Sequence, residues 1–206
     1  AMLKIAQRNS TRLLALINDI LDLQKIESGR LEFHPEKLDL VPLVRNALEA
    51  NASYGAQLNV PFVLDESFLK EGTQQELWIH SDAARLNQVL ANLLSNAAKF
   101  SVEGGEVKVT LKKCGGVARV EVHNEGDGIP EEFQKRIFEK FAQADASATR
   151  PRGGTGLGLS ICKAIVEQLG GDIDFETGPQ QGTTFFFELP LLGSELECER
   201  NSELAE

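Results

Sequence analysis

The first regular hydrophobic pattern lies near the N-terminus, where residues 2–27 contain neither glycine nor proline. Leucine and isoleucine recur there at intervals of three and four positions, in two neighbouring rows: Leu13, Leu16, Ile20 and Leu23, and beside them Leu14, Ile17 and Leu21. This period predicts a helix with a wide apolar stripe. Because one helix cannot bury such a stripe, we expect it to pack on a partner helix in a dimeric bundle. The alternative is that it lies on the domain that follows.

Beyond this helix, the hydrophobic period changes several times between two and about 3.6 residues. The expected elements are a helix over 40–50 capped by Asp39, a strand over 77–81, a helix over 82–99, a hairpin over 106–124 turning at Gly115-Gly116, helices over 131–140 and 157–169, and strands over 172–177 and 183–191. Antiparallel strands that follow one another, interleaved with helices, predict an α/β (α+β) fold. We expect a two-layer α/β sandwich, with a mixed sheet covered by helices on one face and a long helix before it.

Four segments follow from this pattern. We expect residues 1–27 to be the helix and residues 28–37 to be a linker that begins where Gly29 ends the helix. Residues 38–192 would form the main domain, and residues 193–206 a loose acidic tail. Ala1 stands before Met2, which suggests a piece excised from a longer protein.

Composition excludes several classes of partner. The chain has 206 residues, 42% of them hydrophobic, and a net charge of −10 without a basic cluster. This charge disfavours nucleic acid and anionic membrane surfaces as partners. No apolar run is long enough for a membrane span and no signal peptide is recognisable, so we expect a cytoplasmic location. Cys114, Cys162 and Cys198 are widely spaced, which indicates neither a disulfide framework nor a zinc site.

Polar side chains line one side of the helix expected over 82–99. They recur at spacings of three and four positions: Arg85, Gln88, Asn92, Asn96 and Lys99. Asparagine is a poor helix former, so two asparagines in mid-helix suggest a use. An amide oxygen suits magnesium, and a lysine one turn further on can hold a phosphate. The alternative is a solvated helix face, which would suffice for Arg85 and Gln88.

Two glycine-rich stretches complete the candidate site. The stretch "RGGTGLGLSI" (152–161) precedes an apolar helix, an arrangement that favours phosphate binding by backbone N–H groups. It lacks the lysine of a P-loop and the glycine spacing of a dinucleotide-binding loop. The stretch "HNEGDGIPEE" (123–132) carries Asn124 at a strand end, where a flat base could be recognised.

In this order, the stretches resemble the four boxes of the histidine kinase ATP-binding domain, in the class that includes gyrase B, the Hsp90 chaperones and MutL. "NQVLANLLSNAAKF" resembles the N box, "NEGDGI" and "GGTGLGLSI" the two glycine boxes, and "IFEKF" the F box. "LINDILDLQKIESGRLEF" resembles the second dimerisation helix of these kinases. The resemblance implies that residues 1–27 are the second helix of a dimerisation hairpin and that residues 38–192 are the ATP-binding catalytic domain. "FAQADASATRPRGGTG" resembles the lid of the hybrid type.

The resemblance implies an ATP site with Mg²⁺ as cofactor. Asn96 would bind the metal, and the ATP-binding residues would be Asn92, Asn96, Lys99, Phe100, Asn124, Gly126, Gly128, Ile129, Phe141, Arg150, Gly154, Thr155, Gly156, Leu157 and Gly158. Asn92 and Lys99 would contact the phosphates. Asn124 stands where the family usually has an aspartate that accepts from the adenine amino group. Many relatives have an arginine where this chain has Gln143, and Arg150 would supply that charge.

The implied function is transfer of the ATP γ-phosphoryl group to a histidine of a two-component sensor kinase. The partners would be the dimerisation helices of a homodimer and the receiver domain of a response regulator. His34, His80 and His123 all lack the acceptor's sequence context, so we expect this chain to bind Mg-ATP without phosphorylating itself. One alternative is a gyrase- or Hsp90-like ATP hydrolase, although Asn92 replaces the glutamate base of that class. Another is a non-catalytic dimerisation module.

Overall fold

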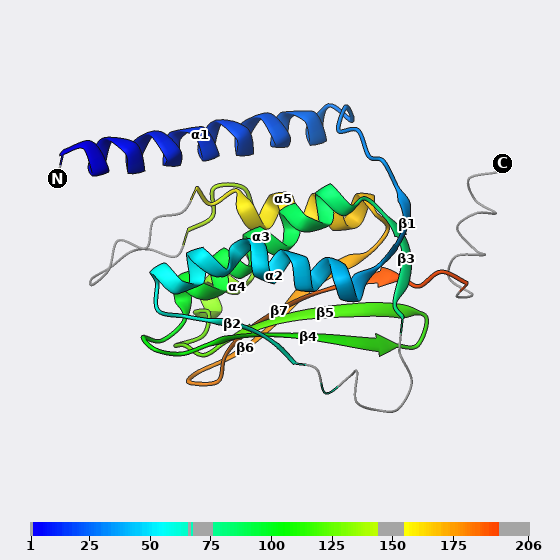
Figure 1. Ribbon diagram of the computed structural model, residues 1–206. Helices are drawn as coiled ribbons and strands as arrows, with labels where there is room; N and C mark the ends of the chain where they lie inside the picture. Colours follow the sequence, from blue (N-terminus) through cyan, green and yellow to red (C-terminus); the bar gives the residue numbers. More distant parts are fainter. Residues whose placement is uncertain (1, 66, 68–75, 144–154, 194–206) are drawn as a thin grey trace.

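The computed structural model describes residues 2–65, 67, 76–143 and 155–193. Its elements are α1 (Met2–Glu27), β1 (Glu36–Asp39), α2 (Leu40–Gln57), β2 (Phe62–Asp65), β3 (Trp78–Ser81), α3 (Ala83–Phe100), β4 (Val107–Cys114), β5 (Val117–Asn124), α4 (Glu131–Gln134), α5 (Gly158–Gln168), β6 (Asp172–Gly178) and β7 (Gly182–Pro190). The helices lie on one side of a twisted sheet, and α1 runs above them (Figure 1). The predicted two-layer α/β fold is confirmed.

The main sheet has five strands in the order β2-β4-β5-β7-β6. Strand β2 pairs with β4 in parallel, whereas the other three pairs are antiparallel, so the sheet is mixed as predicted. The predicted hairpin is present, with β4 and β5 joined at Gly115-Gly116. The strand expected over 77–81 is also present as β3, but it pairs with β1 in a separate two-stranded sheet.

Helix α3 forms the centre of the helical layer. It contacts α2 and α5 on its sides and β4 and β5 beneath it. Leu86, Leu90 and Leu93 on its lower face are fully buried, and each such side chain stabilises the fold by about 1.5–3 kcal/mol. The opposite side of the same helix carries the polar stripe. The sheet and the neighbouring helices therefore fix the direction in which that stripe points.

Aspartates begin both α2 and α3. Asp39 Oδ1 accepts from the N–H groups of Val41 (3.1 Å) and Leu77 (3.2 Å), which confirms the predicted cap. Asp82 caps α3 by accepting from the N–H groups of Ala84 (2.9 Å) and Arg85 (3.0 Å). Burial raises the pKa of Asp82, but the backbone N–H groups that donate to its carboxylate lower the pKa by more. The pKa of Asp82 therefore lies below its usual value.

The helix predicted over 131–140 is wrong in extent, because α4 ends at Gln134. The chain continues in tighter turns, in which the N–H of Arg136 donates to Phe133 O at 3.0 Å. These turns bury Ile137 in the core and pack the partly buried Phe138 against it.

Helix α1 lies on the rest of the chain by a narrow contact, mainly with α5 (Figure 1). Leu23 is buried in this contact and Ile26 packs beside it. Five apolar residues of the helix remain exposed: Leu13, Leu14, Ile17, Ile20 and Leu21. The contact matches the alternative interpretation, in which this helix lies on the domain that follows. The dimeric bundle stays a prediction, since the exposed row of apolar residues could still pack on a partner helix. Among the described helices, none combines the length and apolarity needed to cross a bilayer.

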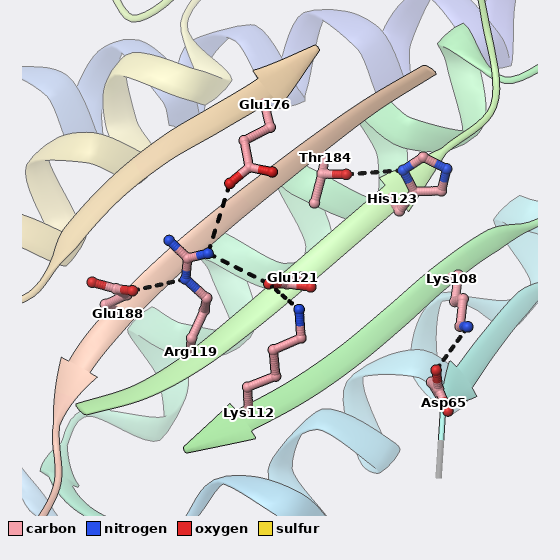
Figure 2. Close-up of polar contacts among 9 residues, drawn as sticks. All are labelled: Asp65, Lys108, Lys112, Arg119, Glu121, His123, Glu176, Thr184 and Glu188. Atoms are coloured by element: carbon pink, nitrogen blue, oxygen red, sulfur yellow. Dashed lines mark hydrogen bonds and ion pairs between the residues drawn. The ribbon is translucent and has the colours of Figure 1, made fainter. Parts of the chain in front are cut away.

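The face of the sheet opposite the helices carries a network of paired charges. Arg119 lies over the Phe186 ring, with 3.7 Å from its guanidinium carbon to the ring centroid, and its Nε donates to Glu188 at 2.7 Å. Figure 2 shows that Lys112 and Glu121 extend this network across neighbouring strands. These charges satisfy one another, so the face is typical of a solvated sheet surface.

Candidate functional site

The polar stripe of α3 divides into two halves with different neighbours. Near the start of the helix, Gln88 donates to the Asp22 carboxylate of α1 at 2.7 Å, and Arg85 lies 3.9 Å from the same group. Further on, Asn92 Nδ2 donates to Gly158 O at 3.4 Å. The sequence therefore brings the middle of α3 against the first turn of α5, 66 positions further along the chain.

The first turn of α5 offers backbone N–H groups to a ligand. Leu157, the residue before the helix, is fully buried and makes no side-chain cap hydrogen bond. The first N–H groups of a helix have no partner within it, and the helix dipole favours an anion at this end. A nucleotide phosphate has the charge and the acceptors that this turn requires.

The F box and the second glycine box meet at Gly156. This residue has φ +73°, and a Cβ added there would lie 2.8 Å from the carbonyl carbon of Phe141. Only glycine fits both the backbone conformation and the contact. Phe141 itself has φ +62°, an uncommon conformation for a bulky residue, and its side chain is 63% exposed. The close backbone contact thus places an exposed aromatic side chain beside the start of α5.

The first glycine box packs against the C-terminal end of α3. A Cβ on Gly126 would lie 2.6 Å from Phe100 O, so glycine allows the loop to approach the helix. The N–H of Val102 donates to Glu125 O at 3.1 Å and holds the same approach. Further along the loop, the N–H of Ile129 donates to Thr177 Oγ1 at 3.0 Å. The loop is therefore fixed between α3 and β6.

Asn124 ends β5 as a buried polar side chain, 3% exposed. Its Nδ2 donates to Glu125 O at 3.2 Å, which directs the amide oxygen away from that carbonyl. Gly182 of β7 permits the packing here, because a Cβ on it would lie 2.0 Å from Asn124 O. The orientation leaves Oδ1 as the atom that can accept a hydrogen bond from a base.

A hollow of about 400 Å³ lies beside the first glycine box, a size within the range of ligand pockets. It is lined by residues 127–131, Gln134 and residues 177–179. Gly128 and Ile129 are predicted base-pocket residues and line it, whereas Asn124 and Gly126 do not. The hollow on its own therefore does not account for the whole predicted site.

The residues on α3 fit a magnesium ion bound together with phosphates. Among the described residues, no group of three or more histidine, cysteine, aspartate or glutamate side chains could hold a metal. Mg²⁺ does not need such a cage, because it usually keeps waters and takes one or two protein oxygens plus substrate phosphates. The half-buried amides of Asn92 and Asn96 can supply an oxygen of this kind.

One carboxylate from α1 reaches the same place. Thr155 Oγ1 donates to Asp19 Oδ2 at 2.9 Å and accepts from the N–H of Leu157 at 3.2 Å. Burial raises the pKa of Asp19, and the negative charge of Asp22 raises it further. The hydrogen bond from Thr155 and the positive charge of Lys99 lower it, but the pKa still lies above its ordinary value. The thiol of Cys162 on α5 is fully buried. Burial raises its pKa to about 12, so the thiol stays protonated.

The predicted site residues thus come together around α3, although they belong to four separate segments. Arg150 and Gly154 lie outside the described residues. Three contributors were missed from the sequence: Asp19, Thr177 and Gly182. Gly182 could have been found, because a glycine follows a turn and precedes the strand "TTFFFELP". Asp19 and Thr177 give no such signal.

Comparison with known proteins agrees with this arrangement. Residues 81–193 match the family model described as "Histidine kinase-, DNA gyrase B-, and HSP90-like ATPase". The signal transduction histidine-protein kinase BarA of Escherichia coli K12 is 36% identical over 203 residues, which cover 92% of this chain and 20% of BarA. The chain thus spans about a fifth of that relative's length.

Solved structures of histidine kinases show the same fold. Full-length ShkA in complex with AMPPNP is similar with a TM-score of 0.74 and 30% identity, over 91% of this chain and 38% of ShkA. ThkA in complex with the response regulator protein TrrA is similar with a TM-score of 0.69 and 28% identity, over 92% of this chain and 50% of ThkA. Both matches extend beyond residues 81–193, so the similarity includes part of the N-terminal region.

Proposed function

The chain belongs to the histidine kinase-, DNA gyrase B- and HSP90-like ATPase family, and we propose that it binds Mg-ATP between α3 and α5 for phosphoryl transfer to a histidine. The observation that carries the proposal is the contact of Asn92 with Gly158, which joins the amide stripe to the first turn of α5. A metal-binding amide and a phosphate-binding helix start then lie on two sides of one nucleotide.

Each group has a distinct task in this proposal. Asn96 holds Mg²⁺, with Asn92 and Lys99 at the phosphates and the N–H groups of residues 156–158 along the triphosphate. When bound, the metal neutralises charge on the β- and γ-phosphates. Phosphoryl transfer depends mainly on positioning and on stabilising charge, which is what amides, a lysine and a helix start provide.

The base is recognised at the other end of α3. Asn124 Oδ1 accepts from the amino group of adenine, since its Nδ2 is already turned toward Glu125 O. Gly126, Gly128 and Ile129 shape the base pocket, and the exposed rings of Phe100 and Phe141 border the nucleotide. Arg150 and Gly154 complete the phosphate contacts in this proposal.

The phosphate acceptor is a histidine of the parent protein outside this chain. His80 is exposed on β3, and His123 Nδ1 lies 2.9 Å from Thr184 Oγ1 on the open face of the sheet (Figure 2). His34 lies after α1, where its N–H donates to Asp82. We expect none of the three to be phosphorylated.

Two partners accompany the activity in this proposal. The exposed row on α1 would pack in a homodimeric helical bundle with the other dimerisation helices. The receiver domain of a response regulator would then take the phosphoryl group, a proposal supported by the solved complex of ThkA with TrrA. We place the reaction in the cytoplasm, where ATP is available.

Calorimetric titration with ATP in magnesium tests the proposal. The wild-type chain should bind, and Asn96→Ala should weaken binding at least tenfold because it removes the metal ligand. Asn87→Ala is the matched control, since Asn87 is an exposed asparagine of the same helix whose Nδ2 donates to Ala83 O. No binding by wild type, or equal weakening by both substitutions, would contradict the site. ATP turnover without an acceptor, lost on Asn92→Ala, would favour the hydrolase instead.

A further inference from the structure

Helix α1 places one carboxylate at the phosphate end of the proposed ATP site. Asp19 Oδ2 accepts from Thr155 Oγ1 at 2.9 Å, and the same hydroxyl accepts from the N–H of Leu157 at 3.2 Å. The carboxylate therefore lies one hydroxyl away from the backbone that leads into α5. Lys99 is near enough for its charge to act on Asp19.

These surroundings are those of a bound phosphate oxygen. The partners of Asp19 are a hydroxyl donor and a lysine charge, close to the start of a helix that lacks a side-chain cap. Each of them stabilises an anion. Asp19 is half-buried, and Asp22 of the same helix adds a second negative charge nearby. A triphosphate brought to this place would meet two carboxylates.

We propose that Asp19 is an internal anion that competes with the nucleotide phosphates, so that ATP binding and the docking of α1 on α5 oppose each other. This inference rests on the proposed ATP site. Asp19 is in this sense a specificity residue, because it disfavours ligands according to their negative charge.

The rest of the α1 contact is suited to release. Leu23 is the one apolar side chain of α1 that is buried among those the structure describes. Ile26 packs beside it, and the remaining contacts are polar: the partly buried Asp22 with Gln88 and Arg85, and the more exposed Glu27 with Lys140. Polar contacts of this kind contribute little net stability, so a bound triphosphate can displace them.

The test is a titration of the full chain with adenosine, ADP and ATP, comparing wild type with Asp19→Asn. Asparagine keeps an oxygen that can accept from Thr155 and removes only the charge. We expect ATP to bind roughly tenfold tighter to Asp19→Asn, ADP to gain less, and adenosine to be unchanged, because the repulsion scales with ligand charge. Glu27→Gln is the matched control, since it removes one carboxylate from α1 away from Thr155 and weakens docking only by an exposed ion pair, so it should change each of the three affinities by less than about twofold.

Several results would overturn the inference. Weaker ATP binding by Asp19→Asn would mean that the carboxylate positions Thr155 for the nucleotide. Equal gains for adenosine and ATP would mean that charge is not the cause. Hydrogen exchange gives a second measurement on the wild type: ATP should speed exchange in α1, and slower exchange there would contradict the competition. If neither protein binds any nucleotide, the proposed ATP site itself is wrong, which is a distinct outcome.

Discussion

Helices α1 and α3 use opposite kinds of surface to contact the rest of the molecule. Helix α3 buries its leucines against the sheet and turns its amides toward α5. Helix α1 leaves most of its leucines and isoleucines exposed and contacts the domain largely through Asp19, Asp22 and Glu27. Both sequences are amphipathic, so the pattern alone does not distinguish a helix built into a core from one that docks on it.

The difference shows what each helix contributes. Because its apolar side is fixed in the core, α3 holds its polar side chains in place for a ligand. A helix such as α1, which docks through carboxylates and only two packed apolar side chains, Leu23 and Ile26, can leave with a small loss of buried apolar area, and its exposed apolar row is available to a partner. The two predictions below use matched pairs of substitutions in these helices.

The largest difference is expected for leucines. Leu93 of α3 is fully buried, and Leu93→Ala should lower the free energy of unfolding by about 2–5 kcal/mol, through lost burial and the cavity that remains. Leu14 of α1 is 62% exposed, and Leu14→Ala should change the same quantity in the monomer by less than about 0.5 kcal/mol. Urea unfolding of both variants measures the contrast. Similar losses would show that α1 is part of the cooperative core.

A smaller difference is expected for the carboxylates. Asp82→Ala removes the cap of α3 and should cost about 1–2 kcal/mol, whereas Glu27→Gln removes an exposed ion pair and should cost a few tenths. Since the pKa of Asp82 is lowered in the folded state, its contribution is complete above the ordinary value near 3.9 and is lost as pH falls through the lower folded-state value.

Urea unfolding between about pH 3 and pH 7 follows this loss. The gap in stability between wild type and Asp82→Ala should be constant near neutrality and should narrow at the acid end. A gap that widened on acidification would show that the folded-state pKa of Asp82 is raised instead.

Local signals in the sequence were sufficient for most of the fold. Asp39 before an apolar period predicted the cap of α2, and Gly115-Gly116 between alternating runs predicted the β4–β5 hairpin. Strands β1 and β2 were missed because neither alternates over its four residues: Glu36–Asp39 has one apolar residue, and Phe62–Asp65 has three in succession. Strand β3 is as short, but it was found because it leads directly into α3. Their pairing is set by distant partners.

The candidate site was predictable where motif residues follow one another and not where distant segments meet. The stripe on α3 is visible as spacing, and one of its members, Asn92, contacts Gly158. The contact of Asp19 with Thr155 joins residues 136 positions apart. No local propensity encodes such a contact, because it depends on how α1 docks on the domain.

The most direct test of the account is a map of where Mg-ATP contacts the ¹⁵N-labelled chain. We predict that backbone signals of Gly156 and Gly158 and side-chain amide signals of Asn92 and Asn96 shift on addition of Mg-ATP. Signals of Arg119 and Glu188 on the open face of the sheet should stay unchanged. Shifts confined to that face, or to the hollow beside Gly178 with α3 and α5 unaffected, would contradict the claim that ATP binds between these two helices.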